Sequence, residues 1–244
     1  MSDTVIVLQD ECILTASGKS GRTPKIEKVG RISIEPFGDM FEQWKTALKE
    51  YREQYDPKSV RLVLPASYSS ARMTQIPYAA GRQLAKMAGN VINDHAGDAI
   101  ADYGVVQSDK KQGVCLCCGS AEQEILQKVI DLCSEIQLPV KEISVPMEGY
   151  LKLLSQTRLY KNKTAIFLLF EENSVTSVLY KEGVCHYVTR SRIFSERGTL
   201  NFGTEIVRNI SGMLQFYATT KAAAPITDVY YTGCMPDDFE VSLE

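Results

Sequence analysis

The sequence predicts an α/β protein in which two copies of a strand–strand–strand–helix–strand (βββαβ) unit are separated by a smaller α/β insertion. Short apolar runs rich in β-branched residues alternate with amphipathic stretches of helical period, the pattern of mixed α/β structure. The same order of elements occurs near both ends of the chain, and the middle has strands and helices of its own. With 244 residues, 44% of them hydrophobic, the chain is long enough to bury a sizeable core.

The first copy is predicted over residues 1–70. Its first two apolar runs are separated by only three polar residues, which predicts two strands joined by a tight turn. Trp44 and Leu48 belong to a series of apolar residues that recur every three or four positions between charges, which indicates an amphipathic helix. The predicted elements are strands at Thr4–Leu8, Cys12–Ala16 and Lys25–Glu35, a helix over Gly38–Tyr55, and a strand at Val60–Leu64.

The second copy is predicted over residues 161–244 and repeats this order. Three apolar strands come first, the helix follows them, and a short apolar strand comes last. Recurrence of such a unit indicates an internal structural repeat. The predicted elements are strands at Thr164–Phe170, Ser174–Tyr180 and Val184–Ile193, a helix over Thr204–Thr219, and a strand at Asp228–Thr232.

The segment between the copies is predicted as an inserted subdomain over residues 71–145. We expect Ser120 to begin one of its helices, because Gln123 three residues later would complete a capping box. A following helix, Pro146–Leu159, is expected to complete the first lobe at about residues 146–160. The other predicted elements are strands at Arg72–Tyr78, Ile100–Gln107, Gly113–Cys118 and Leu138–Val145, and a helix over Ala79–His95.

Charge and hydropathy exclude several classes of protein. The 27 basic and 30 acidic residues give a net charge of −3, whereas a general nucleic-acid binder has a basic face, so we expect no nucleic acid as a partner. No apolar run approaches the roughly 20 residues of a membrane helix, and the N-terminus does not resemble a signal peptide. We also expect the natural polypeptide to continue past Glu244, with a membrane anchor downstream as one form of that continuation.

Seven cysteines without a signal peptide indicate free thiols in a reducing compartment. Cys115, Cys117 and Cys118 fall in a short apolar run that reads as a buried strand, so the first two are expected on one face and the third on the other. Zinc needs about four converging ligands, which neighbouring strand residues do not supply. Core thiols are the favoured interpretation, no metal is expected, and a metal or redox site is the alternative.

Several short stretches resemble motifs of one superfamily. Met73–Pro77 resembles the strand that enters an inserted subdomain, Val188–Ser191 a strand of the second lobe, Glu205–Tyr217 a late helix, and Val229–Gly233 the final strand. In this order they resemble the actin-like, ribonuclease-H-like ATPases, and within them the PilM, FtsA and GspL cytoplasmic-domain branch, PilM-like type IV pilus assembly proteins most of all. The resemblance implies two ribonuclease-H-like (actin-like) lobes with an inserted α/β subdomain of the FtsA/PilM type.

The resemblance also locates the positions that would form a nucleotide cleft. Related ATPases hold phosphates in two hairpin turns, where glycine allows close approach of the backbone to the anion. Here the turns have no glycine and contain adjacent acids that would repel a triphosphate, although acids are also ordinary residues of solvated turns. Only a short loop replaces the usual ATPase lid subdomain. We therefore expect no catalytic residue and no cofactor, with vestigial nucleotide-loop positions at Gln9, Asp10, Glu172, Asn173 and Gly233.

Two functions remain open. The first is a non-catalytic cytoplasmic scaffold, at the inner face of the cell membrane, of a type IV pilus or type II secretion-like assembly platform. By resemblance, it would bind a PilN-like segment of a membrane-anchored partner and link it to a motor ATPase, and a homodimer is a further expected partner state. The alternative is an actin-like ATPase or a sugar-kinase-like enzyme in which Asp10 and Glu172 would bind the metal.

Two sets of residues complete the predictions. A mild basic stretch in the second lobe is interpreted as a solvated face, with a phosphate site as the alternative; it consists of Lys181, Arg190, Arg192 and Arg197. The candidate partner-binding residues are those expected to flank the junction between the first lobe and the insertion, namely Ile76, Pro77, Tyr78 and Tyr103.

Overall fold

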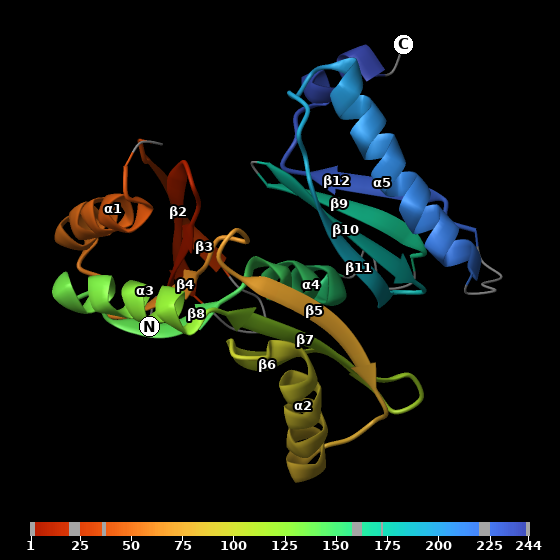
Figure 1. Cartoon of the computed structure of the whole chain (residues 1–244), viewed down its shortest axis with the longest axis horizontal. Coiled ribbons are helices and arrows are strands. Elements are labelled where there is room, and N and C mark those ends of the chain that lie inside the picture. Colours follow the sequence, from red (N-terminus) through yellow and green to blue (C-terminus); the bar gives the residue numbers. More distant parts are fainter. Residues whose placement is uncertain are drawn as a thin grey trace. The chain divides into compact units, whose positions relative to one another are not determined.

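The computed structural model describes residues 3–19, 25–35, 38–157, 163–171, 173–219 and 225–242 (Figure 1). The chain divides into two compact units, each of which contains one predicted lobe. The first unit comprises residues 1–105 and 109–150, and the second comprises residues 106–108 and 151–244. Each unit is described by itself below.

The sheet of the first unit has five strands. Its first three strands are antiparallel neighbours, and the last two add in parallel beside β1. Alternate residues of β1, such as Ile6 and Leu8, are fully buried because every second side chain of a strand points to the same face. In sheet order the strands are β3 (Lys25–Ser33), β2 (Cys12–Lys19), β1 (Asp3–Leu8), β4 (Val60–Val63) and β8 (Val140–Ser144).

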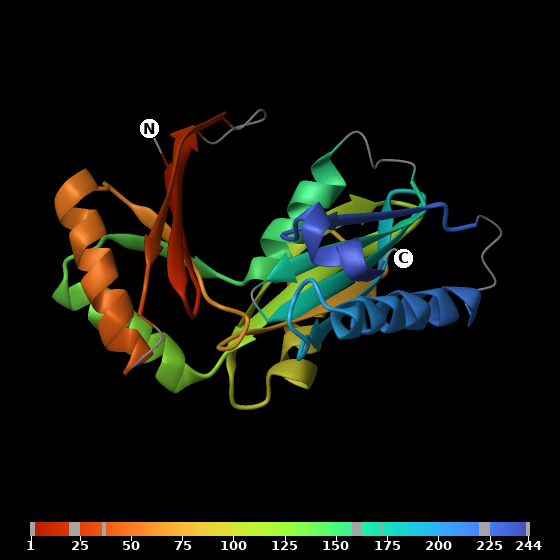
Figure 2. The same ribbon diagram turned by 90° about the horizontal axis from the view of Figure 1, so that it is seen from above.

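Two helices, α1 (Met40–Tyr55) and α3 (Gln123–Glu135), lie side by side in this unit, as both views show (Figures 1 and 2). Helix α1 begins where the Asp39 carboxylate accepts a hydrogen bond from the Phe41 amide at 2.8 Å. The apolar faces of both helices enter one core with the strands, and this core includes Trp44 and Val129. The first lobe therefore consists of one sheet and two helices that share a single hydrophobic core.

The insertion is a three-stranded sheet with one helix. Strand β5 (Ser70–Ile76) pairs antiparallel with the central strand β7 (Gly113–Ala121), and β6 (Ile100–Asp109) is the other edge. Helix α2 (Gly81–Ala96) packs on a core that includes Val114, Leu116 and Cys118. The insertion is shorter than the predicted 71–145, because α3 and β8 belong to the core and the sheet of the first lobe.

The second unit contains a four-stranded sheet and the long helix α5 (Leu200–Thr219). Strands β9 and β10 are buried along almost their whole length, which explains their nearly continuous apolar sequence. In sheet order the strands are β11 (Val184–Arg192), β10 (Ser174–Lys181), β9 (Ala165–Glu171) and β12 (Asp228–Thr232). Helix α4 (Pro146–Gln156) precedes this sheet in the chain, and the 3₁₀ helix η2 (Pro236–Ser242) follows it.

The predicted α/β class and the order of elements are confirmed, and two local predictions are wrong. Ser120 does not cap α3, because it pairs with Ser70 in the β5–β7 ladder and the helix starts at Gln123. Helix α5 starts at Leu200, not at Thr204, because the Thr199 hydroxyl accepts a hydrogen bond from the Phe202 amide at 3.3 Å. The 3₁₀ helix η2 was not predicted. No helix within the described ranges is both long and apolar enough to cross a membrane.

Candidate functional site

The first predicted nucleotide turn joins β1 to β2, and groups of its own lobe occupy its polar atoms. The Gln9 side-chain oxygen accepts a hydrogen bond from the Cys12 thiol at 3.0 Å, and the Asp10 carboxylate accepts one from the Ser67 hydroxyl at 3.2 Å. The Glu11 carbonyl accepts one from the Ile34 amide at 2.8 Å. The turn is thus closed by internal hydrogen bonds.

Trp44 of α1 fixes the position of this turn. Its indole N–H donates to the Gln9 carbonyl at 3.0 Å, and its side chain is fully buried. The ring makes edge-on contacts with Phe41 and Tyr68 at centroid distances of 5.3 and 5.6 Å. Such an aromatic cluster combines a large buried apolar area with a fixed geometry, so it holds the turn against the helix.

The second predicted nucleotide turn joins β9 to β10 and is held by arginine. The Arg197 guanidinium donates to the Glu171 carbonyl at 2.9 Å and to the Gly233 carbonyl at 2.8 Å. It also lies 3.7 Å from the Asp238 carboxylate of η2. One side chain therefore bridges the end of β9, the end of β12 and η2, and two of these are segments that the resemblance assigns to the nucleotide cleft.

A second arginine, Arg190, forms an ion pair with Glu171 beside this turn. Arg190 donates to the Ser174 hydroxyl at 2.9 Å and lies 3.6 Å from the Glu171 carboxylate. The Asn173 carbonyl accepts a hydrogen bond from the Ile193 amide at 2.9 Å. Glu172 lies outside the described residues. Arg190 is exposed, as a solvated face requires, but Arg190 and Arg197 are also structural partners of the turn, which the interpretation of the basic stretch did not include.

Gly233 is required by the geometry at the end of β12. It has a positive φ of 84°, and a Cβ at this position would approach the Phe170 carbonyl oxygen to 2.2 Å. The next residue, Cys234, has a thiol whose pKa is raised to about 11 by burial. This glycine therefore serves close contact between β9 and β12, and the thiol beside it is a poor nucleophile at neutral pH.

The cysteines of β7 also lie in the interior. Cys118 packs in the core beneath α2, while the Cys115 thiol lies 4.0 Å from the Met73 sulfur on the other face, as the strand pattern predicted. Burial raises the pKa of Cys115 to about 11 and raises that of Cys118 as well. Among the described residues, no three His, Cys, Asp or Glu side chains are grouped as metal ligands.

Three of the four candidate partner-binding residues lie at the far end of β5. Ile76 is 7% exposed and belongs, with the partly buried Tyr103, to the core of the insertion. It ends β5, about 20 Å along the strand from Ser70, where the chain enters the insertion. Pro77 and Tyr78 follow it and are exposed. Ile76, Pro77 and Tyr78 therefore lie at the end of β5 that is far from the point of entry, and the role of all four residues in partner binding stays a prediction.

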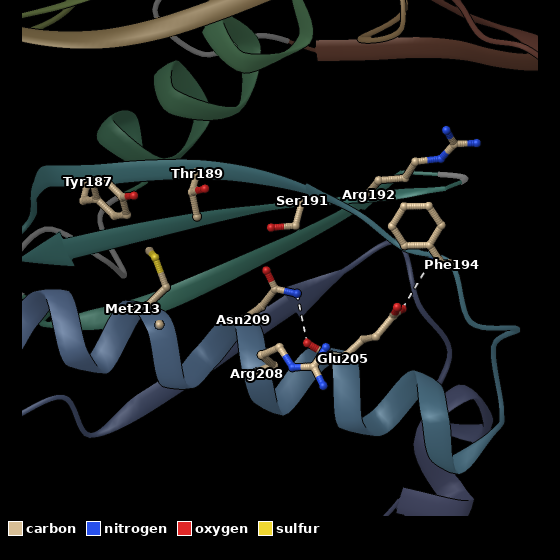
Figure 3. A pocket seen from close by; sticks show the side chains of 10 residues that line it. Tyr187, Thr189, Ser191, Arg192, Phe194, Glu205, Arg208, Asn209 and Met213 are labelled. Atoms are coloured by element: carbon tan, nitrogen blue, oxygen red, sulfur yellow. Dashed lines mark hydrogen bonds between the residues drawn. The ribbon is translucent and has the colours of Figure 1, made fainter.

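The second unit contains a pocket that the sequence did not indicate (Figure 3). It has a volume of about 420 Å³ and lies between the edge strand β11 and α5. The Glu205 carboxylate closes one end by accepting hydrogen bonds from the Phe194 and Ser195 amides at 3.1 and 3.2 Å. The rest of the lining mixes polar and apolar side chains of β11, α5 and the residue Phe194, and it includes Thr189, Ser191, Asn209 and Met213.

Comparison with known proteins supports the fold. No protein-family model matches the chain, and neither does any curated protein. Among solved structures, the PilM–PilN type IV pilus biogenesis complex matches with a TM-score of 0.60 at 14% identity. The match covers 78% of this chain, which spans only 61% of the length of that one.

Two further structures match over nearly the whole chain. A Bacteroides thetaiotaomicron protein with an actin-like ATPase fold and unknown function has a TM-score of 0.61 at 10% identity, covering 99% of this chain and 86% of its own. The cytoplasmic domain of EpsL, an inner membrane component of the Vibrio cholerae type II secretion system, has a TM-score of 0.51 at 13% identity, covering 96% and 87%. The chain thus has the actin-like ATPase fold that the sequence predicted.

Proposed function

We propose that this protein is a non-catalytic scaffold of a type IV pilus or type II secretion-like assembly platform, acting on the cytoplasmic side of the membrane. The observation that carries the proposal is the Arg197 bridge between the Glu171 and Gly233 carbonyls. In a nucleotide-binding relative these two segments would contact ATP, whereas here a protein cation ties them together. The likeness to the PilM–PilN complex and to EpsL supports an assembly role.

The negative charge of the first turn also argues against a nucleotide site. Phosphoryl transfer depends on positioned metal ions and on groups that neutralise phosphate charge. The first turn presents adjacent carboxylates at Asp10 and Glu11, and its Gln9 carbonyl is already bound by Trp44. A triphosphate at this turn would meet negative charge and no free glycine backbone, so we infer that the fold serves binding and not hydrolysis.

The partner in this proposal is an extended segment of a PilN-like membrane protein, bound by strand addition to the insertion. Strand β6 is an edge of the insertion sheet, and it exposes Ile100 and Val105. The Tyr103 amide donates to the Asp102 carboxylate at 2.8 Å, a local bond that an incoming strand could replace. An edge with apolar side chains and exchangeable amides suits β-addition.

Thermal unfolding with and without millimolar Mg-ATP tests the absence of a nucleotide site. A ligand that binds only the folded state raises the melting temperature in proportion to its occupancy. We expect no shift and no phosphate release. A rise of several degrees, or phosphate release that Asp10→Asn abolishes, would contradict the proposal and favour the enzyme.

Calorimetric titration with a synthetic peptide tests the partner. The peptide is the cytoplasmic segment of the PilN-like protein from the same organism. We expect binding that Val105→Asp weakens at least tenfold and that the control Val29→Asp, on the exposed edge strand β3, leaves unchanged. Absence of binding to the unmodified chain, or equal loss in both variants, would refute this mode.

A further inference from the structure

The pocket between β11 and α5 lies where the two lobes differ in sequence. Ile13 and Val175 are the second residues of β2 and β10, and both are fully buried. In the first lobe Ile13 lies opposite Ile32 of β3, which packs against the core. In the second lobe Val175 lies opposite Ser191 of β11, which lines the pocket. A hydroxyl group therefore stands where the repeated unit has an apolar residue.

Hydroxyl groups continue along this side of β11. Tyr187, Thr189 and Ser191 alternate along the strand, so their side chains point to the same side of the sheet, towards α5 (Figure 3). Thr189 and Ser191 are partly buried, and neither has a hydrogen-bond partner in the described part of the chain. Ser177 of β10 lies opposite Thr189, and it is fully buried with its hydroxyl unpaired among the described residues. Such groups carry a desolvation cost that a bound polar molecule would offset.

Helix α5 supplies the opposite wall of the pocket. The Asn209 amide nitrogen donates to the Glu205 carbonyl at 2.9 Å, which leaves the side-chain oxygen of Asn209 as an acceptor (Figure 3). The Phe194 and Ser195 amides both donate to the same carboxylate oxygen of Glu205, so its other oxygen is also an acceptor. Met213 is 1% exposed and gives this wall an apolar part. The wall thus combines fixed acceptors with apolar surface, as small-molecule sites do.

The charges of the lining favour an acidic ligand. Arg192 and Arg208 both line the pocket, both are exposed, and neither forms an ion pair within the described ranges. The Arg192 guanidinium lies 5.4 Å from the ring centroid of Phe194, which is 79% exposed. The lining contains one carboxylate, Glu205, and backbone amides already bind it. Positive charge therefore exceeds negative charge around the pocket.

We propose that this pocket binds a small polyhydroxylated acid. Hydroxyl groups of the ligand would contact Thr189, Ser191 and Asn209, because serine and threonine hydroxyls both donate and accept hydrogen bonds. The acid group, a carboxylate or a phosphate, would contact the guanidinium groups of Arg192 and Arg208. The volume of about 420 Å³ is within the range of small-molecule sites. The inference uses neither hairpin turn, so it does not depend on the proposed scaffold role.

Calorimetric titration of the full chain with three six-carbon compounds separates the contributions of the acid and the hydroxyl groups. Gluconate has both, hexanoate has only the acid, and sorbitol has only hydroxyl groups. Glucose 6-phosphate and inorganic phosphate test a phosphate in place of the carboxylate. We expect gluconate or glucose 6-phosphate to bind at least tenfold more tightly than hexanoate, sorbitol and inorganic phosphate. The tighter of the two identifies the acid group.

Two variants with matched controls locate the binding. Ser191→Ile introduces the residue that the first lobe has at this position, so it should weaken binding at least tenfold. Its control, Thr204→Val, removes a hydroxyl from the exposed side of α5 and should leave the affinity unchanged. Arg208→Gln should weaken the binding of the acid at least fivefold, and Arg31→Gln, on the exposed strand β3, should not.

Melting temperatures establish that each variant is folded before its affinity is compared. If Ser191→Ile does not fold, the comparison of Arg208→Gln with Arg31→Gln decides. Absence of binding by both gluconate and glucose 6-phosphate overturns the proposal. So does sorbitol or hexanoate binding as tightly as gluconate, or a folded pocket variant that binds as well as its control.

Discussion

The two hairpin turns occupy equivalent places in the two lobes, and different forces stabilise them. The β1–β2 turn is held by the buried Trp44, whose indole donates to the Gln9 carbonyl. The β9–β10 turn is held by the Arg197 and Arg190 guanidinium groups around Glu171. In both lobes the groups that bind the turn come from the same lobe. The difference shows that the fold needs a fixed turn at this place but does not prescribe the chemistry that fixes it.

The largest effect is expected at the apolar anchor. Trp44→Ala should lower the free energy of unfolding by about 3–5 kcal/mol, because it leaves a cavity beneath the turn and removes the hydrogen bond to Gln9. Trp44→Phe keeps much of the packing and should cost clearly less. Urea unfolding followed by circular dichroism measures both variants. A cost below about 1 kcal/mol for Trp44→Ala would show that the turn is held by something else.

A second pair of variants sharpens the contrast between the lobes. Leu62→Ala should cost about 2–5 kcal/mol because α3 and β8 bury this residue completely. Val229→Ala, on the edge strand β12 where this residue is 44% exposed, should change stability by no more than about 0.5 kcal/mol. Trp44 is the only tryptophan, so its fluorescence during urea unfolding reports on the first lobe. Equal costs in the two lobes would show that Val229 of β12 is as well packed as Leu62 of β4.

The polar anchor should have an intermediate effect. Arg197→Ala removes two hydrogen bonds from a charged donor and should cost about 1.5–3 kcal/mol. Arg208→Ala, on the exposed part of α5, serves as the control and should stay within about 0.5 kcal/mol. Thermal unfolding by circular dichroism compares the two. If both variants melt together with the unmodified chain, Arg197 does not stabilise the turn.

The smallest effect is expected in the core of the second lobe. Ser177 is fully buried, and its hydroxyl has no hydrogen-bond partner among the described residues. Ser177→Ala should therefore stabilise the chain by up to about 1 kcal/mol, because it removes an unsatisfied polar group. A rise of a few degrees in the melting temperature is the expected result. A fall would mean that the hydroxyl has a partner, such as a buried water molecule.

Much of the fold could be predicted because periodicity and turn residues act locally. The hairpin of β9 and β10 follows from two apolar runs with a polar turn between them, and α1 follows from the spacing of Trp44 and Leu48. The repeat of the βββαβ order then indicated the fold, which the comparisons with solved structures confirm.

The rest depends on contacts between distant residues. Arg197 looked like one cation of a solvated stretch, and only the folded chain places it against Gly233, 36 residues away. The assignment of α3 to the first lobe depends on β8 pairing with β4, which no local pattern specifies. The 3₁₀ helix η2 depends on Phe239 packing against Phe170 and Phe202. Tertiary packing decided each of these features.

Ser70, the first residue of β5, pairs with Ser120 near the end of β7, and these two strands connect the insertion to its lobe. The chain therefore leaves the first lobe and returns to it at neighbouring points, through a narrow double-stranded stem. Segments attached in this way can be exchanged or lost without breaking the sheet that carries them, since closing the gap requires only a short turn. The insertion is thus the part of this protein that evolution can most readily replace, and a natural place for partner preference to change between relatives.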